Sequence, residues 1–414
     1  MTMKLSNLFK ESSVGVYAKR EVCGIRQASA FALLTVFMTL AAAWSLPAHA
    51  DLTLTFGGDV NFNKNKQAPR GDHVSYFGRR VTYEEMTRHL APLIDGDVNF
   101  ANIETVVTDD EHLPAQQKAF VFRSHPNSIR HLMDLGFNLF SLANNHAYNH
   151  GSAGLDHTLD AMEHLQRRGA RPIAFAGIER RRADFERARI FEVRGYRIAF
   201  AAIGIIDPRF RSRGEGVGVL NYHDESDYAL TLKSLREADA DLKIISIHYG
   251  TEMQVELDRG QRAKFLRAIS EGDADLVLGH HPHVVRPVEL RDGRAIFYSL
   301  GNYLMAGAAD LTRRAEAQDY GLFGRAHFAR DARRGGRLSL QALEAVPLTG
   351  MHLQARPMPK AASERRIELL NQLSRQQLGV HAAEFRVRSD GRGVECSNIS
   401  GLALSARAAE VCGN

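Results

Sequence analysis

The stretch Gly279-His280-His281-Pro282-His283, which follows the apolar run Leu276-Val277-Leu278, decides how this sequence is interpreted. Three histidines directly after a predicted buried strand are not typical of a hydrophobic core. Imidazole nitrogens bind zinc, manganese, iron, nickel and copper. The side chains of His281 and His283 can point to one side if Pro282 keeps the segment extended. The stretch therefore predicts a metal site at the end of a strand.

Further predicted strands are also followed by polar side chains that can bind a metal. In chain order these side chains are Asp59 and Asn61 after 52–56, Asn102 and Glu104 at the end of 98–103, Asn144, Asn145 and His146 after 138–143, His248 and Glu252 after 242–247, and Asn302 after 294–300. Functional groups in α/β folds gather at the carboxyl ends of strands. We therefore expect these side chains to share one site.

Each of these groups also has an ordinary structural interpretation. Asp59 follows two glycines, which is typical of a turn or a helix cap. The pair Asn144-Asn145 is typical of a turn, and a lone histidine such as His248 is typical of a core residue with satisfied hydrogen bonds. In the functional interpretation, Asn144 or Asn145 ligates a metal or fixes a phosphate-like group, and His146 is a ligand or a general acid. Glu252 either orients a ligand histidine or begins a helix. Chance alone does not explain why polar side chains of this kind follow one predicted strand after another.

Short apolar runs alternate with amphipathic stretches, which predicts an α/β fold. Besides the strands above, the pattern predicts hairpins turning at Gly195 and at Asp292-Gly293, outer strands over 321–328 and 338–346, and helices over 127–135, 155–167, 258–270 and 362–376. The motif-bearing domain is expected to span 51–355. A weak boundary then precedes a C-terminal helix and tail, 356–414.

Residues 1–50 are typical of a secretion signal. Lys19, Arg20 and Arg26 precede the apolar run 28–46, and Ala48-x-Ala50 fits a cleavage site, so the mature chain would begin at Asp51. Retention of 28–46 as a membrane anchor is the alternative. In either case we expect an exported protein, periplasmic or extracellular. Cys396 and Cys412 can then form a disulfide that closes the tail, or stay unpaired.

The charge of the chain argues against a nucleic-acid partner. The formal net charge is +5, but five basic and two acidic side chains in residues 1–50 carry +3 of it. The remaining +2 on so large a body does not form a nucleic-acid-binding surface. Two loops, 64–80 and 207–218, are expected to wall the site. Their Lys64, Lys66, Arg209, Arg211 and Arg213 would favour an anionic substrate.

Taken together, the motifs resemble the CapA family of poly-γ-glutamate capsule proteins, a divergent branch of the calcineurin-like metallophosphoesterases. The motifs are Gly58-Asp59, Asn102-x-Glu104, Ala143-Asn144-Asn145-His146, His248-x-Gly250-x-Glu252, Gly279-His280-His281-Pro282-His283 and Tyr298-Ser299-Leu300-Gly301-Asn302. The resemblance runs from about residue 52 to about residue 376. It implies a four-layer α/β/β/α sandwich with one or two divalent metal ions, of which Mn, Fe and Zn fit best.

The resemblance also implies a role for each matching residue. Asp59 would be the first ligand, Glu104 the bridging acid, and Asn145 and His146 the Asn-His pair; the later histidine ligands would be His248, His281 and His283, with His280 as an alternative to His281. The sequence departs from the family pattern at two positions: Asn61 stands where a histidine is usual, and Asn149 stands where an aspartate is common. Tyr249 and Met253 also stand where Trp and Tyr are common.

Three functions are consistent with these features. The first is a metal-dependent hydrolase acting on a phosphoester or a related anionic cell-envelope substrate, with His146 protonating the leaving group. The second is a capsule-assembly component that binds or releases poly-γ-glutamate. The third is a binding module whose site has lost its chemistry.

Overall fold

The computed structural model describes residues 51–62, 71–76, 79–396, 401 and 403–413. The predicted leader 1–50, its apolar run 28–46, and Lys64 and Lys66 lie outside the described residues. Within the described ranges, no helix has both the length and the apolar character that crossing a bilayer requires.

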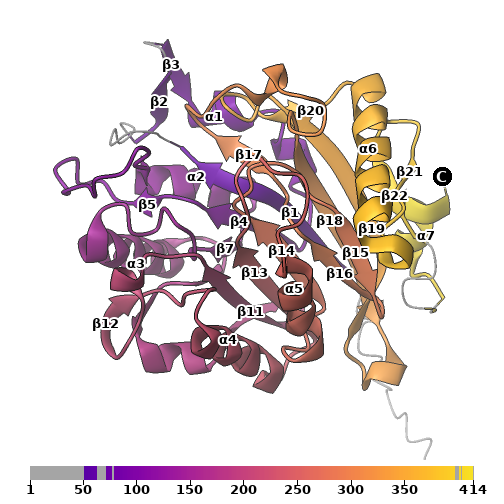
Figure 1. The fold of residues 1–414 in the computed structure, drawn as a ribbon, viewed down its shortest axis with the longest axis horizontal. Coiled ribbons are helices and arrows are strands. Elements are labelled where there is room, and N and C mark those ends of the chain that lie inside the picture. Colours follow the sequence, from indigo (N-terminus) through magenta and orange to yellow (C-terminus); the bar gives the residue numbers. More distant parts are fainter. Residues whose placement is uncertain (1–50, 63–70, 77–78, 397–400, 402, 414) are drawn as a thin grey trace, which may run out of the picture. The chain divides into compact units, whose positions relative to one another are not determined.

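The larger of two main sheets has ten strands and holds the N-terminal motifs. Its central order is β21-β22-β19-β18-β1-β4-β7-β8, with β17 beside β1 and β20 beside β19. The strands are β1 (Leu52–Asn61), β4 (Val98–Ile103), β7 (Leu139–Ser141), β8 (Ala174–Ala176), β17 (Asn302–Met305), β18 (Gly321–Arg330), β19 (Leu338–Thr349), β20 (Arg356–Pro357), β21 (Arg386–Val387) and β22 (Gly393–Glu395). β1, β4, β7 and β8 run parallel, so their carboxyl ends meet at one edge (Figure 1).

The second sheet has six strands in the order β10-β11-β13-β14-β16-β15. Its strands are β10 (Arg189–Val193), β11 (Tyr196–Gly204), β13 (Leu242–His248), β14 (Leu276–His280), β15 (Val288–Arg291) and β16 (Arg294–Phe297). β11, β13, β14 and β16 are parallel. Both predicted hairpins are present, and their turns have positive φ at Arg194-Gly195 and Asp292-Gly293.

The two sheets pack face to face through alternating side chains. The rings of Phe56 and Phe297 lie 4.8 Å apart, and those of Phe100 and Phe200 lie 5.9 Å apart. Phe56 and Phe100 come from the larger sheet, and the other two rings from the smaller one. Because strand side chains alternate in direction, the next residues along β11 contribute instead to a separate apolar cluster with the helices on the outer face.

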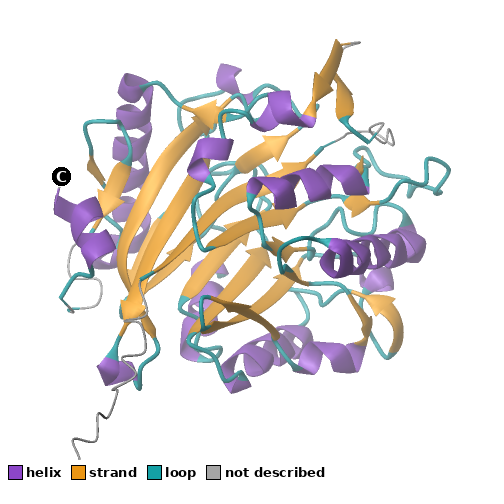
Figure 2. Cartoon of the chain, turned by 180° about the vertical axis from the view of Figure 1, so that it is seen from behind, coloured by secondary structure: helices purple, strands orange, loops and turns teal. Residues whose placement is uncertain are grey.

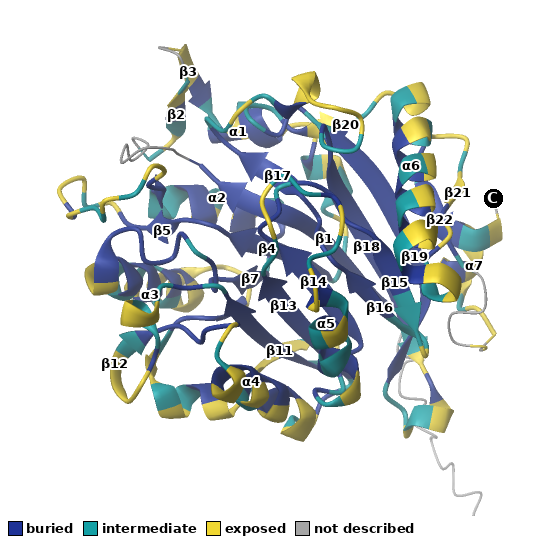
Figure 3. Cartoon of the chain, in the orientation of Figure 1, coloured by how far each residue is buried: buried dark blue, intermediate teal, exposed yellow. Residues whose placement is uncertain are grey.

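Helices cover the outer faces of the sheets. The helices are α1 (Tyr83–Thr87), α2 (Pro126–Leu135), α3 (Gly151–Arg168), α4 (Glu225–Glu237), α5 (Gln261–Ser270), α6 (Lys360–Leu378) and α7 (Ala406–Gly413). Leu232 of α4 and Phe265 of α5 share that outer cluster with Ile245 of β13. α2 and α3 lie over the larger sheet (Figure 2). The central strands of the two main sheets are buried, and the helices expose their outer faces (Figure 3), so the predicted α/β fold with two stacked sheets is confirmed.

Small two-stranded sheets line the loops around this body. They pair β2 (His73–Tyr76) with β3 (Arg79–Thr82), β5 (Val106–Val107) with β6 (Arg123–Ser124), and β9 (Glu179–Arg181) with β12 (Glu215–Gly218). The C-terminal tail is more ordered than its polar sequence suggests. β22 extends the larger sheet through β19, and a disulfide joins Cys396 to Cys412 in α7.

β1 is longer than expected, which changes how Asp59 is presented. The sequence predicts that the strand stops at Gly57-Gly58, but β1 continues to Asn61 across a register shift between Phe56 and Asp59. A Cβ atom on Gly58 would lie 1.8 Å from the carbonyl oxygen of Gly301. The glycines therefore let two backbones approach closely inside the sheet, instead of ending the strand.

Candidate metal centre

The predicted ligands converge between the two sheets. β1 and β4 of the larger sheet bring Asp59 and Glu104, and β13 and β14 of the smaller sheet end at His248 and His280. All four side chains are fully buried. Residues separated by about two hundred positions therefore meet because both sheets direct their parallel carboxyl ends to the same edge.

Two groups of side chains each place three potential ligand atoms within 4.8 Å of one another. One group is Glu104, His248 and His281, and the other is Asp59, Glu104 and His283. Glu104 belongs to both groups. A carboxylate has two oxygens and can bind two cations, so the arrangement fits a pair of metal ions that share Glu104.

Asp59, in the second group, contacts several of the surrounding polar side chains. Its Oδ1 lies 2.8 Å from Asn102 Nδ2 and 3.2 Å from His280 Nδ1, and its Oδ2 lies 3.2 Å from His283 Nδ1. Burial opposes ionisation of Asp59, but hydrogen bonds from His280 and His283 outweigh it and hold the pKa well below its usual value. Asp59 is therefore an ionised carboxylate inside the protein.

The unsatisfied polar atoms fit a cation. Neither carboxylate oxygen of Glu104 has a hydrogen-bond partner among the described residues, and the same holds for Nδ1 of His281 and Nε2 of His280. A buried polar group without a partner costs on the order of 1–3 kcal/mol. Bound metal would supply the missing partner, since carboxylate oxygens and imidazole nitrogens suit Mn, Fe and Zn.

The electrostatics of the cluster point the same way. Burial and the charge of Asp59 raise the pKa of Glu104 well above its usual value. Burial opposes protonation of His283, but Glu104 and Asp59 outweigh it and raise the His283 pKa to about 10. Without metal, protons thus compensate two carboxylates that lie close together. A divalent cation can take over that role and release the protons.

The turn that holds the last histidines is not extended, contrary to the expectation from Pro282. His281 has φ of 95° and His283 has φ of 57°, both in the left-handed region. Non-glycine residues seldom adopt this region, and such strain is characteristic of functional sites. The backbone NH of His281 donates to Asp59 Oδ2 over 3.3 Å, and His283 Nδ1 lies 2.8 Å from Asn302 Oδ1. These bonds hold the turn against the cluster.

The structure separates the roles of the adjacent asparagines. Asn145 Oδ1 lies 2.8 Å from His248 Nε2, so its carbonyl oxygen points into the first group. Asn144 instead donates to the carbonyl of Ile103 over 2.8 Å and accepts the backbone NH of His146 over 3.0 Å. Asn145 is therefore the candidate ligand, and Asn144 shapes the turn. Burial lowers the pKa of His248 to about 3, so its ring is neutral, the form in which imidazole binds a metal.

His146 reaches the cluster from the side. Its Nε2 lies 3.9 Å from Glu104 Oε1, and its Nδ1 lies 2.7 Å from Asn149 Oδ1. The same Asn149 oxygen accepts the backbone NH of Phe122 over 2.7 Å. Because this oxygen is an acceptor, Nδ1 of His146 carries the proton, and Nε2 of the neutral ring presents a lone pair to the site. Burial lowers the His146 pKa well below its usual value.

The remaining predicted residues lie around this centre. Asn302 pairs with Asp59 between β17 and β1 and contacts His283. Asn61 is buried further along β1, beside Met305. Glu252 is exposed in the loop after β13 and does not begin a helix, since α5 starts only at Gln261. Its charge nevertheless acts on Glu104, which places it at the mouth of the site.

Two of the three arginines expected to attract an anion are already paired with carboxylates, and the third, Arg213, contacts the carbonyl oxygen of Pro208. Arg209 binds Asp207 over 2.6 Å, and Arg211 binds Asp227 over 2.7 Å. No sequence motif indicated Lys118, whose Nζ donates to the carbonyl oxygen of Asn145 over 2.7 Å. None indicated Phe122, which stacks on His146 with ring centroids 3.9 Å apart. Both lie in the irregular connection between β5 and β6, where no periodicity marks them.

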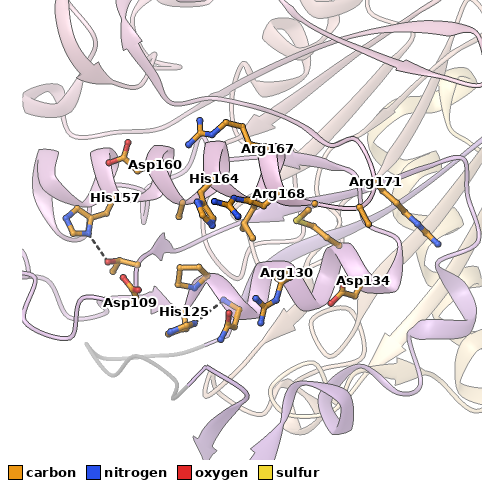
Figure 4. A pocket seen from close by; sticks show the side chains of 18 residues that line it. Asp109, His125, Arg130, Asp134, His157, Asp160, His164, Arg167, Arg168 and Arg171 are labelled. Carbon is orange, nitrogen blue, oxygen red and sulfur yellow. Dashed lines mark hydrogen bonds between the residues drawn. The ribbon is translucent and has the colours of Figure 1, made fainter.

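A separate cavity of about 980 Å³ lies between α2 and α3. Arg130 on α2 faces Arg168 and His164 on α3 across it (Figure 4). None of the predicted site residues lines it, and acidic groups are interspersed with the basic ones, Asp160 being bound to Arg180 over 2.7 Å. The metal-ligand geometry therefore belongs to the strand ends and not to this cavity.

Comparison with known proteins places the chain in a family. The model of the bacterial capsule synthesis protein PGA_cap matches residues 53–306, more than half of the chain. The chain belongs to the PGA_cap family. The matched range includes every candidate ligand from Asp59 to His283, and it confirms the resemblance seen in the sequence motifs.

The chain is also similar in sequence to curated capsule and polyglutamine synthesis proteins. The chain is 27% identical over 279 residues to the PGA biosynthesis protein CapA of Bacillus subtilis, covering 66% of this chain and 68% of that protein. It is 25% identical to the capsule biosynthesis protein CapA of Bacillus anthracis, covering 61% of this chain and 59% of the relative. The probable polyglutamine synthesis accessory protein Rv0574c of Mycobacterium tuberculosis is 30% identical, over 50% of this chain and 55% of that protein.

Solved structures that align with parts of the chain include phosphoesterases. The calcineurin-like phosphoesterase YfkN from Bacillus subtilis aligns with a TM-score of 0.42 and 14% identity, covering 79% of this chain and 98% of that chain. The putative 5'-nucleotidase from Staphylococcus aureus aligns with a TM-score of 0.39 and 13% identity, covering 77% of this chain and 58% of that chain.

Proposed function

We propose that this PGA_cap protein is an exported, metal-dependent hydrolase that acts on a phosphoester or a related anionic substrate of the cell envelope. The observation that supports this most strongly is the pair of ligand groups that share Glu104. Cations held by these groups would stabilise the negative charge that develops in a phosphoryl displacement and would lower the pKa of a water molecule.

The ligands divide between two positions. Asp59, Glu104 and His283 would hold one ion, and Glu104, Asn145, His248 and His281 the other. His280 contacts Asp59 at 3.2 Å and orients that carboxylate. Orientation of a ligand by a neighbouring hydrogen bond is typical of metal sites.

His146 is the proposed proton donor to the leaving group. Its Nδ1 proton is already used in the contact with Asn149, so donation from Nε2 requires a doubly protonated ring. Burial disfavours that form. We therefore expect catalysis by His146 to weaken as the pH rises, and an aspartate at position 149 would strengthen it.

The names of the curated relatives favour a second function, binding of a carboxylate polymer such as poly-γ-glutamate during capsule assembly. In this case the metal pair would hold carboxylates without cleaving a phosphoester. A protein that folds but binds no metal would instead support the third function, a binding module without chemistry.

One assay separates the candidates. Hydrolysis of bis-p-nitrophenyl phosphate and p-nitrophenyl phosphate is measured with Mn²⁺ for the wild type and for His281→Ala. Metal-dependent turnover that His281→Ala abolishes supports the hydrolase. If the metal-loaded wild type cleaves neither ester but binds a γ-linked glutamate oligomer, the capsule-assembly function replaces it.

A further inference from the structure

The connection between β5 and β6 is fixed to the turn that carries Asn145 and His146. The backbone NH of Gln116 donates to the carbonyl of Asn149 over 2.7 Å, and the NH of Phe122 donates to the Asn149 side chain over 2.7 Å. Lys118 lies between these two anchors. Its position relative to the metal ligands is therefore set by several bonds and not by a free loop.

The ammonium group of Lys118 lies beside the candidate metal ligand. Its Nζ donates to the main-chain oxygen of Asn145, as described above, and lies 4.5 Å from the centre of the Tyr148 ring. The side-chain oxygen of the same Asn145 lies 2.8 Å from His248 Nε2. One residue thus connects Lys118 to the metal cluster.

Lys118 keeps donor capacity for a ligand. An ammonium group has three N–H donors, and one of them serves Asn145. Lys118 forms no ion pair with a carboxylate within the part of the chain that the structure describes, unlike Arg209 and Arg211. Burial lowers the pKa of Lys118, and the carboxylates of Glu104, Asp207 and Glu252 act in the opposite direction.

We propose that Lys118 is a substrate-positioning residue that binds an anionic oxygen of the molecule held at the metal pair. This deepens the proposed function, because it requires the anion to occupy that centre. The ligand class is an organic anion with one group on the metals and a further phosphate or carboxylate oxygen directed to Lys118. The half-buried position strengthens such a contact relative to one in bulk water.

The test measures binding of two probes to the full-length, Mn²⁺-loaded protein by calorimetry: inorganic phosphate and a γ-linked glutamate tetramer. The variants are Lys118→Met and Lys118→Arg. Lys233→Met, which removes an exposed lysine of α4, is the matched control. Metal content and thermal midpoint are recorded for each protein, because a merely structural Lys118 would alter those properties.

We expect Lys118→Met to weaken binding about tenfold, the effect of losing one charge-assisted hydrogen bond. Lys118→Arg should recover part of the loss, and Lys233→Met should bind like the wild type. Loss confined to phosphate or to the glutamate tetramer identifies which oxygen Lys118 contacts. The proposal is overturned if Lys118→Met binds both probes as tightly as the wild type, or if the wild type binds neither.

Failure of the hydrolase proposal would look different. A protein that binds an anion through Lys118 but cleaves no ester retains this inference and loses the catalytic function. A protein that cleaves esters with an unchanged KM in Lys118→Met retains the catalytic function and loses this inference.

Discussion

Glu104 Oε1 lies 3.4 Å from His248 Nε2, and both side chains are fully buried. The two residues come from different sheets and are 144 positions apart in the sequence. The pKa of Glu104 is raised and that of His248 is lowered, chiefly by burial. Neither oxygen of the Glu104 carboxylate has a hydrogen-bond partner among the described residues, and a cation next to the neutral His248 ring would supply one.

Replacing Glu104 by glutamine should remove metal while sparing the fold. Glutamine keeps the shape of the side chain but loses the charge that both ligand groups share. We expect metal content, measured by plasma mass spectrometry, to fall from about two equivalents to near zero. The exposed Glu368→Gln in α6 is the control and should retain its metal.

The same Glu104→Gln variant separates function from stability. In metal-free protein, removing a buried carboxylate without hydrogen-bond partners should leave the thermal midpoint unchanged or raise it. Added Mn²⁺ should then stabilise only the wild type. A large loss of stability in the metal-free variant would mean that Glu104 has a structural partner instead of a metal.

The two ligand groups predict a difference in stoichiometry. His281→Ala disrupts the group with His248, and His283→Ala disrupts the group with Asp59. Each variant should lose about one of two metal equivalents. The combined variant should lose both, while the exposed His89→Ala should lose none. Complete loss in either single variant would indicate one shared ion.

Asn149→Asp should change the pH profile of hydrolysis. A carboxylate at Nδ1 of His146 would favour the doubly protonated ring and raise its pKa from the low value that burial causes. If the protonated ring donates to the leaving group, activity is lost as the pH rises through this pKa. The alkaline limb should therefore move to higher pH in Asn149→Asp. If the alkaline limb of the plot of kcat against pH lies at the same pH in Asn149→Asp and the wild type, His146 is not the general acid.

A buried charge network in the larger sheet predicts how stability depends on pH. Glu344 lies 2.7 Å from His327 Nε2 and also contacts Arg392. Burial opposes ionisation of Glu344, but His327 and the arginines outweigh it and lower the pKa from 4.5 to about 2. Because the folded pKa is the lower one, this contribution is present above pH 4.5 and is lost as the pH falls towards 2.

Glu344→Gln should therefore destabilise the protein by about 3 kcal/mol at pH 7, the cost of leaving buried partners unpaired. The difference in unfolding free energy from the wild type should shrink as the pH falls from 4.5 towards 2. Urea unfolding of both proteins at pH 7 and at pH 3 measures this difference in unfolding free energy. An equal difference at the two pH values would mean that ionised Glu344 does not stabilise the fold.

The sequence predicted the parts of the site that follow regular strands. β4 ends beside Asn102 and Glu104 as expected, because an apolar run followed at once by polar groups marks a strand end. The left-handed backbone at His281 and His283 could not be foreseen, since bonds to Asp59 and Asn302 from distant strands hold that turn. Lys118 was missed for a similar reason: its role depends on a contact with Asn145 and not on local pattern.

The most direct test of the metal pair is anomalous diffraction from crystals of the Mn²⁺-loaded protein, recorded at the manganese absorption edge. Two peaks flanking the carboxylate of Glu104 are expected, one next to Asp59 and His283 and the other next to His248 and His281. Peaks away from Glu104, or none in crystals of protein saturated with Mn²⁺, would contradict a shared metal centre.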